Sequence, residues 1–210
     1  MKRTFALIFT VLLAFSLIAC DGNVPDSGTN ATPSETSQGD KQASASSDLS
    51  ETEPPAGAKV LVAYFSRTGE NYGVGVIEKG NTEIIAEMIA AKTGGDLFRM
   101  ESVNAYPSGY DDCTKVAREE KNANARPELT ANVTDFEDYD VIYLGYPIWW
   151  SDMPMPVYTF LESYDFSGKT IIPFCTHAGS GLSGTVKSIQ TACPGATVRD
   201  GFAISGATAQ

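Results

Sequence analysis

One apolar run of strand length determines how this chain folds: Lys59-Val60-Leu61-Val62-Ala63-Tyr64-Phe65-Ser66. A run with so few polar residues is typical of a strand covered on both faces of a parallel sheet. The polar loop Arg67-Thr68-Gly69 follows, and after a short excursion a helical pattern begins at Asn81-Thr82. A helix start can bind an anion, because its first backbone N–H groups have no partner within the helix. The sequence therefore predicts a phosphate-binding loop.

The chain beyond residue 58 alternates between apolar runs and helical patterns. Strands are expected at 59–66, 96–101, 140–146, 169–175 and 197–205. Helices are expected at 82–93, 110–121, 155–163 and 183–192. This alternation predicts an α/β fold with a doubly wound parallel sheet of five strands. Pro173 weakens the fourth strand, since proline has no N–H to donate, and residues 70–80 predict a hairpin through Val74-Gly75-Val76-Ile77.

The composition is strongly acidic. The chain has 210 residues, a net charge of −11 and a sequence pI near 4.5. Such a charge disfavours electrostatic attraction to nucleic acid and to anionic lipid, so no nucleic-acid partner is expected. The hydrophobic fraction of 42% suffices for one ordinary core.

The first twenty residues form a unit of their own. Lys2 and Arg3 precede the apolar stretch 5–18, which has the charge order of a secretory signal and is short for a membrane span. The ending Leu17-Ile18-Ala19-Cys20 resembles a bacterial lipobox. This resemblance implies a signal peptide over 1–19, cleavage before Cys20 and acyl chains on its sulfur. The exported protein would then be a lipoprotein in the lipid bilayer, on the outer face of the cytoplasmic membrane. An uncleaved signal anchor and an ordinary cleaved signal are the alternatives.

Residues 20–57 separate this signal from the globular part. They are rich in Ser, Thr, Pro, Gly, Asp and Glu. They contain almost no large apolar side chains, and Val24 and Leu49 are the exceptions. Because almost nothing there offsets the entropy of ordering, the composition predicts a disordered tether with a reach of roughly 30–40 Å. Residues 58–210 then have the right size for one domain.

Three loops are expected at the carboxyl edge of the sheet, where open α/β sheets bind their ligands. The first offers hydroxyl and amide groups, the second large aromatic rings, and the third small residues that let a backbone approach a ligand closely. Their sequences are Ser66-Arg67-Thr68-Gly69 with Asn81-Thr82, then Pro147-Ile148-Trp149-Trp150, then Thr176-His177-Ala178-Gly179-Ser180-Gly181. Together they suit a phosphorylated planar heterocycle.

These loops resemble motifs of the flavodoxin family, in the group that carries Tyr-Phe-Ser-Arg-Thr-Gly, a separated Asn-Thr, Gly-Tyr-Pro-Ile-Trp-Trp and Thr-His-x-Gly-Ser-Gly. The resemblance covers nearly all of 59–205 and implies a strand order of 2-1-3-4-5 and non-covalent FMN. By this resemblance the phosphate is held by Ser66, Thr68, Asn81 and Thr82, with Arg67 beside it. The isoalloxazine ring is covered by Pro147, Ile148, Trp149 and Trp150. Its polar edge is contacted by Thr176, His177, Gly179, Ser180 and Gly181. Because the chain stops at Gln210, soon after the fifth expected strand, the family's usual last helix is expected to be missing.

Each motif also has a plainer explanation. The first loop alone is consistent with a strand-to-helix connection that caps the helix. Trp149 and Trp150 alone are consistent with ordinary core or interface packing. His177, the only histidine, is a surface residue, a flavin contact or a proton donor.

The remaining reactive residues give no recognised motif. With Cys20 assigned to lipid, Cys113, Cys175 and Cys193 leave at least one free thiol, and a disulfide between Cys113 and Cys193 is an alternative. One histidine and scattered cysteines make no metal site, and no catalytic residue is identified.

The resemblance favours one function over two others. The first is an FMN-dependent electron carrier that exchanges electrons with a redox partner protein or a membrane electron donor. The second is an NAD(P)H-dependent reductase of quinones or nitro compounds, and the third is a binding lipoprotein without redox activity. Stacked tryptophan rings and a negative surface disfavour added charge on a reduced flavin, so a low potential is expected for the step from semiquinone to hydroquinone.

Overall fold

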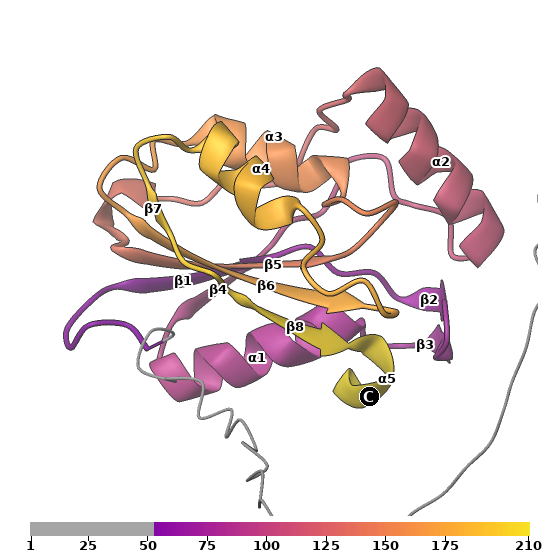
Figure 1. Ribbon diagram of the computed structural model, residues 1–210, viewed down its shortest axis with the longest axis horizontal. Coiled ribbons are helices and arrows are strands. Elements are labelled where there is room, and N and C mark those ends of the chain that lie inside the picture. Colours follow the sequence, from indigo (N-terminus) through magenta and orange to yellow (C-terminus); the bar gives the residue numbers. More distant parts are fainter. Residues whose placement is uncertain (1–52) are drawn as a thin grey trace, which may run out of the picture. The chain divides into compact units, whose positions relative to one another are not determined.

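The expected parallel sheet lies at the centre of the computed structural model, which describes residues 53–210 (Figure 1). The sheet order is β4-β1-β5-β6, and the fifth position is shared by β7 and β8, which both pair with β6. Its strands are β1 (Val60–Tyr64), β4 (Asp96–Arg99), β5 (Val141–Pro147), β6 (Thr170–His177), β7 (Thr197–Val198) and β8 (Phe202–Ser205). Numbered along the chain, this order is 2-1-3-4-5, so the predicted fold class and strand order are confirmed.

The predicted signal peptide, Cys20 and most of the predicted tether lie outside the described residues. Within residues 53–210, no helix is both long enough and apolar enough to cross a bilayer.

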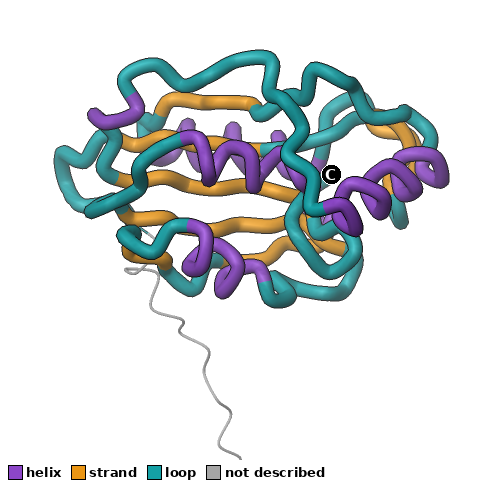
Figure 2. The backbone as a smooth tube through the Cα atoms, turned by 90° about the horizontal axis from the view of Figure 1, so that it is seen from above, coloured by secondary structure: helices purple, strands orange, loops and turns teal. Residues whose placement is uncertain are grey.

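Helices cover both faces of the sheet. α1 and α5 lie on one face, α3 and α4 lie on the other, and α2 lies beside α3 (Figure 1). Figure 2 shows the strands side by side, with helices in front of them. The helices are α1 (Asn81–Thr93), α2 (Tyr110–Ala123), α3 (Met155–Ser163), α4 (Thr185–Ala192) and α5 (Gly206–Ala209), with a 3-10 turn at Phe136–Asp138.

Every residue of β1 is buried, as the apolar run predicts. Successive side chains of a strand point to opposite faces, so the run supplies two cores at once. Leu61 and Ala63 belong to the larger core, which includes Phe160 of α3. Val60 and Val62 belong to the smaller core beneath α1.

The fifth strand differs from the expected continuous strand over 197–205. Two residues separate Ile171 from Phe174 on β6, whereas three separate their partners Val198 and Phe202. The extra residue forms a bulge opposite Pro173, which has no N–H to donate to a neighbouring strand. Because of the bulge, the side chains of β8 point to the opposite face of the sheet from the one that the β7 pattern would give them. Val198 packs on the larger core, whereas Phe202 stacks on Phe174 in the smaller one.

Two further expectations concern the segments beside the sheet. The excursion after β1 is a hairpin, as predicted, in which β2 (Gly69–Asn71) pairs antiparallel with β3 (Gly75–Ile77). After β8 the described chain forms the four-residue helix α5, which packs against α1. A long last helix is not among the elements of residues 53–210.

Candidate functional site

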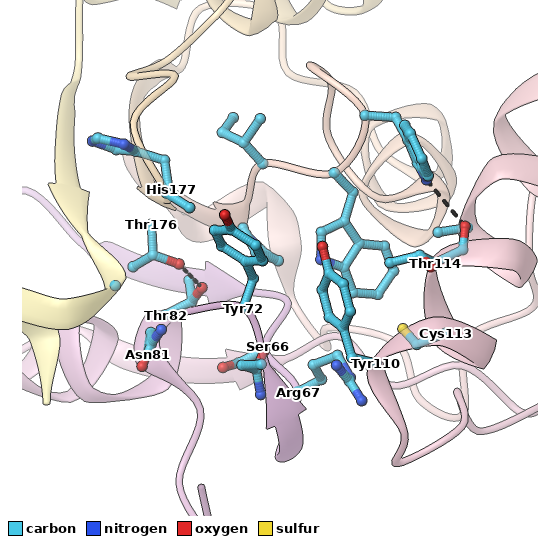
Figure 3. Close-up of a pocket in the computed structure, with 18 residues that line it drawn as sticks. Ser66, Arg67, Tyr72, Asn81, Thr82, Tyr110, Cys113, Thr114, Thr176 and His177 are labelled. Atoms are coloured by element: carbon cyan, nitrogen blue, oxygen red, sulfur yellow. Dashed lines mark hydrogen bonds between the residues drawn. The ribbon is translucent and has the colours of Figure 1, made fainter. Parts of the chain in front are cut away.

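A cavity of about 330 Å³ opens at the carboxyl ends of β1, β5 and β6 (Figure 3). The chain leaves β1 for β4 on one side and later returns to β5 on the other, so this edge is the switch point of the strand order. All three predicted loops contribute to its lining. The predicted site residues that line it are Ser66, Arg67, Asn81, Thr82, Pro147, Ile148, Trp149, Trp150, Thr176 and His177.

One wall of the cavity is the start of α1. The Ser66 side chain caps the helix, since its Oγ accepts a hydrogen bond from the Glu83 N–H at 3.1 Å. In the described part of the chain, no hydrogen bond engages the N–H groups of Asn81 and Thr82. Free N–H groups and the positive end of the helix dipole together suit an anion such as phosphate.

Gly80 lets the first loop approach this helix start closely. A Cβ atom at Gly80 would lie 2.1 Å from Ser66 Oγ and 2.7 Å from the Arg67 carbonyl oxygen. No side chain fits in that space. The interrupted motif is therefore brought together as the sequence predicts, with residues 66–67 against residues 80–82.

A buried hydroxyl pair joins α1 to β6. The Oγ1 atoms of Thr82 and Thr176 lie 2.8 Å apart, and the two residues are only 1% and 4% exposed. A buried hydroxyl is costly when it has no partner, so this bond fixes the helix start relative to the sheet.

We expect Thr82→Val to lower the free energy of unfolding by about 1–3 kcal/mol, because the Thr176 hydroxyl then loses its partner. Thr176→Val should cost a similar amount for the reciprocal reason. The double replacement leaves neither hydroxyl unpaired, so its cost should be clearly less than the sum of the two single costs. Urea unfolding measures all three, and strictly additive losses would show that the pair is not coupled.

Arg67 lines the cavity, but its guanidinium hydrogen bonds go to backbone carbonyls. It donates to the carbonyl oxygens of Glu70 at 2.6 Å, Pro107 at 2.9 Å and Ser108 at 2.7 Å. These bonds tie the base of the hairpin to the segment before α2. A direct role beside a phosphate stays a prediction.

Trp149 forms a rigid aromatic wall. Its ring packs edge-on against Phe65, with centroids 5.3 Å apart, and against Tyr106, at 5.1 Å. The Tyr106 hydroxyl donates to Glu120. Burial, together with this bond, raises the pKa of Tyr106, so the phenol keeps its proton and the bond persists.

The Trp150 side chain packs against α2 and does not stack on Trp149. Its indole Nε1 donates to the Thr114 carbonyl oxygen at 3.0 Å, and the Arg118 guanidinium lies 3.5 Å from the ring centroid. The Lys121 ammonium donates to the Trp150 carbonyl oxygen at 2.6 Å. Trp150 and Ser151 both have positive φ, 51° and 60°, which is costly for residues with a side chain. The contacts with α2 offset this cost.

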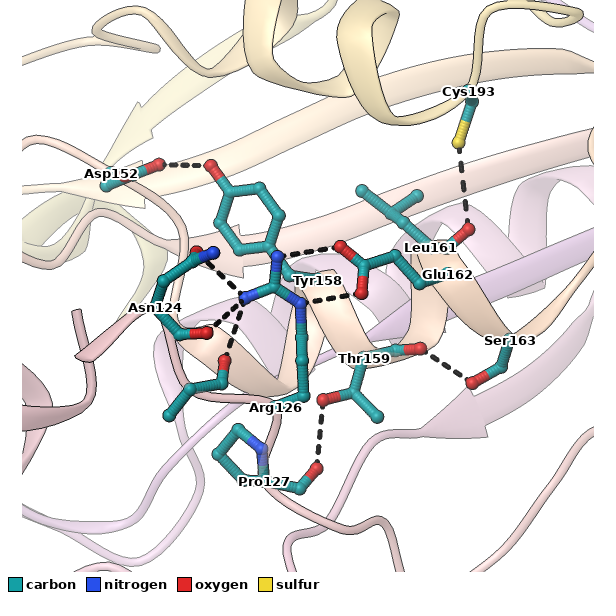
Figure 4. Close-up of polar contacts among 11 residues, drawn as sticks. Asn124, Arg126, Pro127, Asp152, Tyr158, Thr159, Leu161, Glu162, Ser163 and Cys193 are labelled. Carbon is teal, nitrogen blue, oxygen red and sulfur yellow. Dashed lines mark hydrogen bonds and ion pairs between the residues drawn. The ribbon is translucent and has the colours of Figure 1, made fainter. Parts of the chain in front are cut away.

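Helix α3 contacts the turn after β5 at Asp152, the residue that follows Trp150 and Ser151 (Figure 4). Asp152 accepts a hydrogen bond from the Tyr158 hydroxyl at 2.8 Å. The Arg126 guanidinium lies over the Tyr158 ring and makes two 2.7 Å hydrogen bonds to the Glu162 carboxylate. These bonds lower the pKa of Glu162. The turn after β5 is therefore fixed from both α2 and α3.

The third loop contributes less than the sequence predicts. β6 continues to His177, so Thr176 and His177 lie at a strand end. The His177 Nδ1 accepts the Gly179 N–H at 2.8 Å, and in Figure 3 the ring points away from the middle of the cavity.

Four predicted site residues do not line the cavity: Thr68, Gly179, Ser180 and Gly181. The chain turns back after His177, since the Gly181 carbonyl oxygen accepts from the Cys175 thiol. This fold-back directs the glycine-rich end of the loop away from the site.

Several lining residues were missed by sequence reasoning. They come from the hairpin, from α2 and from the start of α5: Asn71, Tyr72, Tyr110, Cys113, Thr114, Ala117 and Gly206. The helical pattern of 110–121 predicts that a helix forms, but it does not indicate that this helix borders the cavity.

The alternative disulfide between Cys113 and Cys193 is wrong, because Cys113, Cys175 and Cys193 are free and buried. Burial raises the pKa of Cys175 to about 12 and that of Cys193 to about 11. Residues 53–210 contain no cluster of three metal-ligating side chains.

The fold and this cavity define a class: doubly wound α/β proteins with a candidate ligand site at the switch point of a parallel sheet. The family model described as Flavodoxin matches residues 59–210, and the chain belongs to the flavodoxin family.

Solved structures of flavoproteins resemble the chain. A putative flavoprotein from Bacteroides uniformis ATCC 8492 is 33% identical, with a TM-score of 0.60 over 71% of this chain and 92% of that one. A putative flavoprotein from Bacteroides eggerthii DSM 20697 is 29% identical, with a TM-score of 0.60 over 72% of this chain and 93% of that one. A flavoprotein from Lactobacillus acidophilus NCFM, crystallised in complex with FMN, is 23% identical, with a TM-score of 0.56 over 70% of this chain and 92% of that one. Comparison with curated proteins gave no match.

Proposed function

We propose that the chain binds FMN non-covalently in this cavity and serves as an electron-transfer flavoprotein. One observation carries the proposal: a helix start with free N–H groups and a rigid tryptophan border the same cavity at the switch point of the sheet. An anion site beside an aromatic wall matches a ligand with a phosphate at one end and a flat ring at the other. The Lactobacillus acidophilus flavoprotein in complex with FMN supports the choice of cofactor.

The residues of the cavity divide between the two ends of such a ligand. Ser66, Asn81 and Thr82 would hold the phosphate at the start of α1, and Trp149 would pack on the ring. Thr68 and Arg67 stay predicted contacts of the phosphate end. FMN supplies one- or two-electron transfer when bound, and the protein sets its position and potential.

The lining chemistry supports a low reduction potential for the bound flavin. The titratable residues that line the cavity are Arg67, Tyr72, Tyr110, Cys113 and His177, and no carboxylate is among them. Burial raises the pKa of Cys113, so this thiol stays neutral. Arg67, the only lysine or arginine in the lining, is engaged by three carbonyls. Because Arg67 is assigned to the phosphate end, no lysine or arginine of the lining is assigned to the ring, and this supports a low reduction potential.

We further propose that the acidic flavodoxin domain is held at the membrane. The proposal rests on Lys2, Arg3 and the ending Leu17-Ile18-Ala19-Cys20, which favour export and lipid attachment at Cys20. The electron partner would then be a redox protein or a membrane donor on the outer face of the cytoplasmic membrane. Labelling of bacteria with a fatty-acid probe tests whether lipid is attached at Cys20. Label on the wild type but not on Cys20→Ser supports it, and an unlabelled soluble wild type would refute it.

Three measurements on the purified chain separate the functions. FMN binding, with reversible photoreduction and without NADH or NADPH oxidation, supports the carrier. Steady oxidation of NADH or NADPH with a quinone or nitro compound as acceptor would favour the reductase. Failure to bind FMN would leave only a binding protein without redox activity.

A further inference from the structure

We infer that Tyr72 and Tyr110 form a second aromatic wall, besides Trp149, that packs on the flavin ring. The inference rests on the proposed FMN binding and assigns a role to the hairpin that interrupts the phosphate loop. Both residues line the cavity, and their ring centroids lie 5.9 Å apart with the planes tilted by 39°. Figure 3 labels both tyrosines among the residues that line the cavity.

The two rings come from separate elements that meet at the cavity. Tyr72 lies in the turn between β2 and β3, and Tyr110 is the first residue of α2. Tyr72 is 68% exposed although it borders a cavity. A tyrosine held there with most of its surface in water gains apolar contact when a flat ligand covers it.

The hairpin is fixed to the start of α2, so the positions of the two rings are coupled. The Glu70 N–H donates to the Ser108 carbonyl oxygen at 2.8 Å, and the Tyr110 N–H donates to the Glu70 carboxylate at 3.0 Å. A Cβ atom at Gly69 would lie 2.6 Å from the same Ser108 oxygen, so the two backbones touch. The three carbonyl contacts of Arg67 join the same segments.

The rest of the lining explains why this wall is needed. The loop after β6 brings no aromatic ring over the cavity, because Ala178 is small and the His177 ring is bonded to Gly179 and points away. Trp150 has one ring face against Arg118. Among the described residues that line the cavity, the tyrosine pair is therefore the aromatic contact available to a planar ligand besides Trp149 and the partly covered Trp150.

The test measures the dissociation constants of the full chain, purified in detergent, for FMN and for riboflavin, which lacks the phosphate. Tyr72→Ala should raise both constants by about the same factor, roughly tenfold, because Tyr72 contacts the ring and not the phosphate. Tyr72→Phe keeps the ring and should stay within about twofold of the wild type. Val76→Ala is the matched control, since Val76 lies on the same hairpin, is 80% exposed and does not line the cavity.

Each result either supports or overturns the inference. Equal losses for both flavins in Tyr72→Ala, with Val76→Ala unchanged, support it. If the wild type binds FMN but Tyr72→Ala binds it equally well, this inference fails and the proposed function stands. A loss for FMN but not for riboflavin would mean that Tyr72 acts through the phosphate end, and an equal loss in Val76→Ala would mean a general effect of the hairpin. Both outcomes overturn it. A wild type that binds neither flavin ends the proposed function, and this inference with it.

Discussion

Gly80→Ala should weaken FMN binding about 100-fold and lower the free energy of unfolding by about 1–3 kcal/mol. The added methyl group would lie 2.1 Å from Ser66 Oγ and 2.7 Å from the Arg67 carbonyl oxygen, so the first loop must move away from the start of α1. That movement separates the Ser66 side chain from the helix N–H groups proposed to bind the phosphate. Hydrogen bonds to a charged group are among the stronger ones, at about 1.5–3 kcal/mol each, which accounts for the size of the loss.

Gly109→Ala is a close control for this prediction. Gly109 precedes α2 with φ −73° and ψ 142°, nearly the conformation of Gly80 before α1, at φ −70° and ψ 147°. A Cβ atom at Gly109 meets no atom within 4 Å. Calorimetric titration with FMN and urea unfolding should find Gly109→Ala close to the wild type in both respects. If Gly80→Ala also keeps its FMN affinity within about twofold, the phosphate does not bind at the start of α1.

Trp149→Ala should weaken FMN binding about 30-fold, because stacking of an aromatic ring on a base is worth about 1–3 kcal/mol and a flavin offers a similar flat face. The replacement also removes the edge contacts with Phe65 and Tyr106, and we expect a loss of about 2–3 kcal/mol in the free energy of unfolding. Titration under conditions where circular dichroism shows a folded protein separates the two effects.

Trp150→Ala provides the comparison for Trp149. Trp150 is 43% exposed, and Arg118 already covers one face of its ring. Its removal should therefore change FMN affinity by about threefold or less. A larger loss for Trp150→Ala than for Trp149→Ala would reverse the assignment of the ring-binding tryptophan.

The sheet could be predicted because its signals are local. The apolar run at 59–66 is long enough for a buried strand, and the helix expected at 155–163 has the bounds of α3. The bulge between β7 and β8 could not be predicted, because it depends on which residue of the last strand lies opposite Pro173. That pairing is a property of the assembled sheet.

The candidate site was predictable where it follows strand ends. Residues after β1, β5 and β6 meet at one edge in any parallel sheet with this strand order, so the sequence alone suffices to group Ser66, Trp149 and Thr176. Tyr72 and Tyr110 could not be added to that group, because the hairpin and α2 reach the cavity through contacts between segments distant in sequence. The fold-back that removes Ser180 from the lining is likewise a tertiary feature.

Titration of the purified full chain with FMN, followed by calorimetry, is the most direct test that the cavity at the switch point is a flavin site. One FMN per chain should bind, with a measurable heat and an increase in the unfolding temperature, and mass spectrometry should identify the same compound in any chromophore released from the protein as isolated. A colourless protein that shows neither heat nor stabilisation at millimolar FMN would contradict the account.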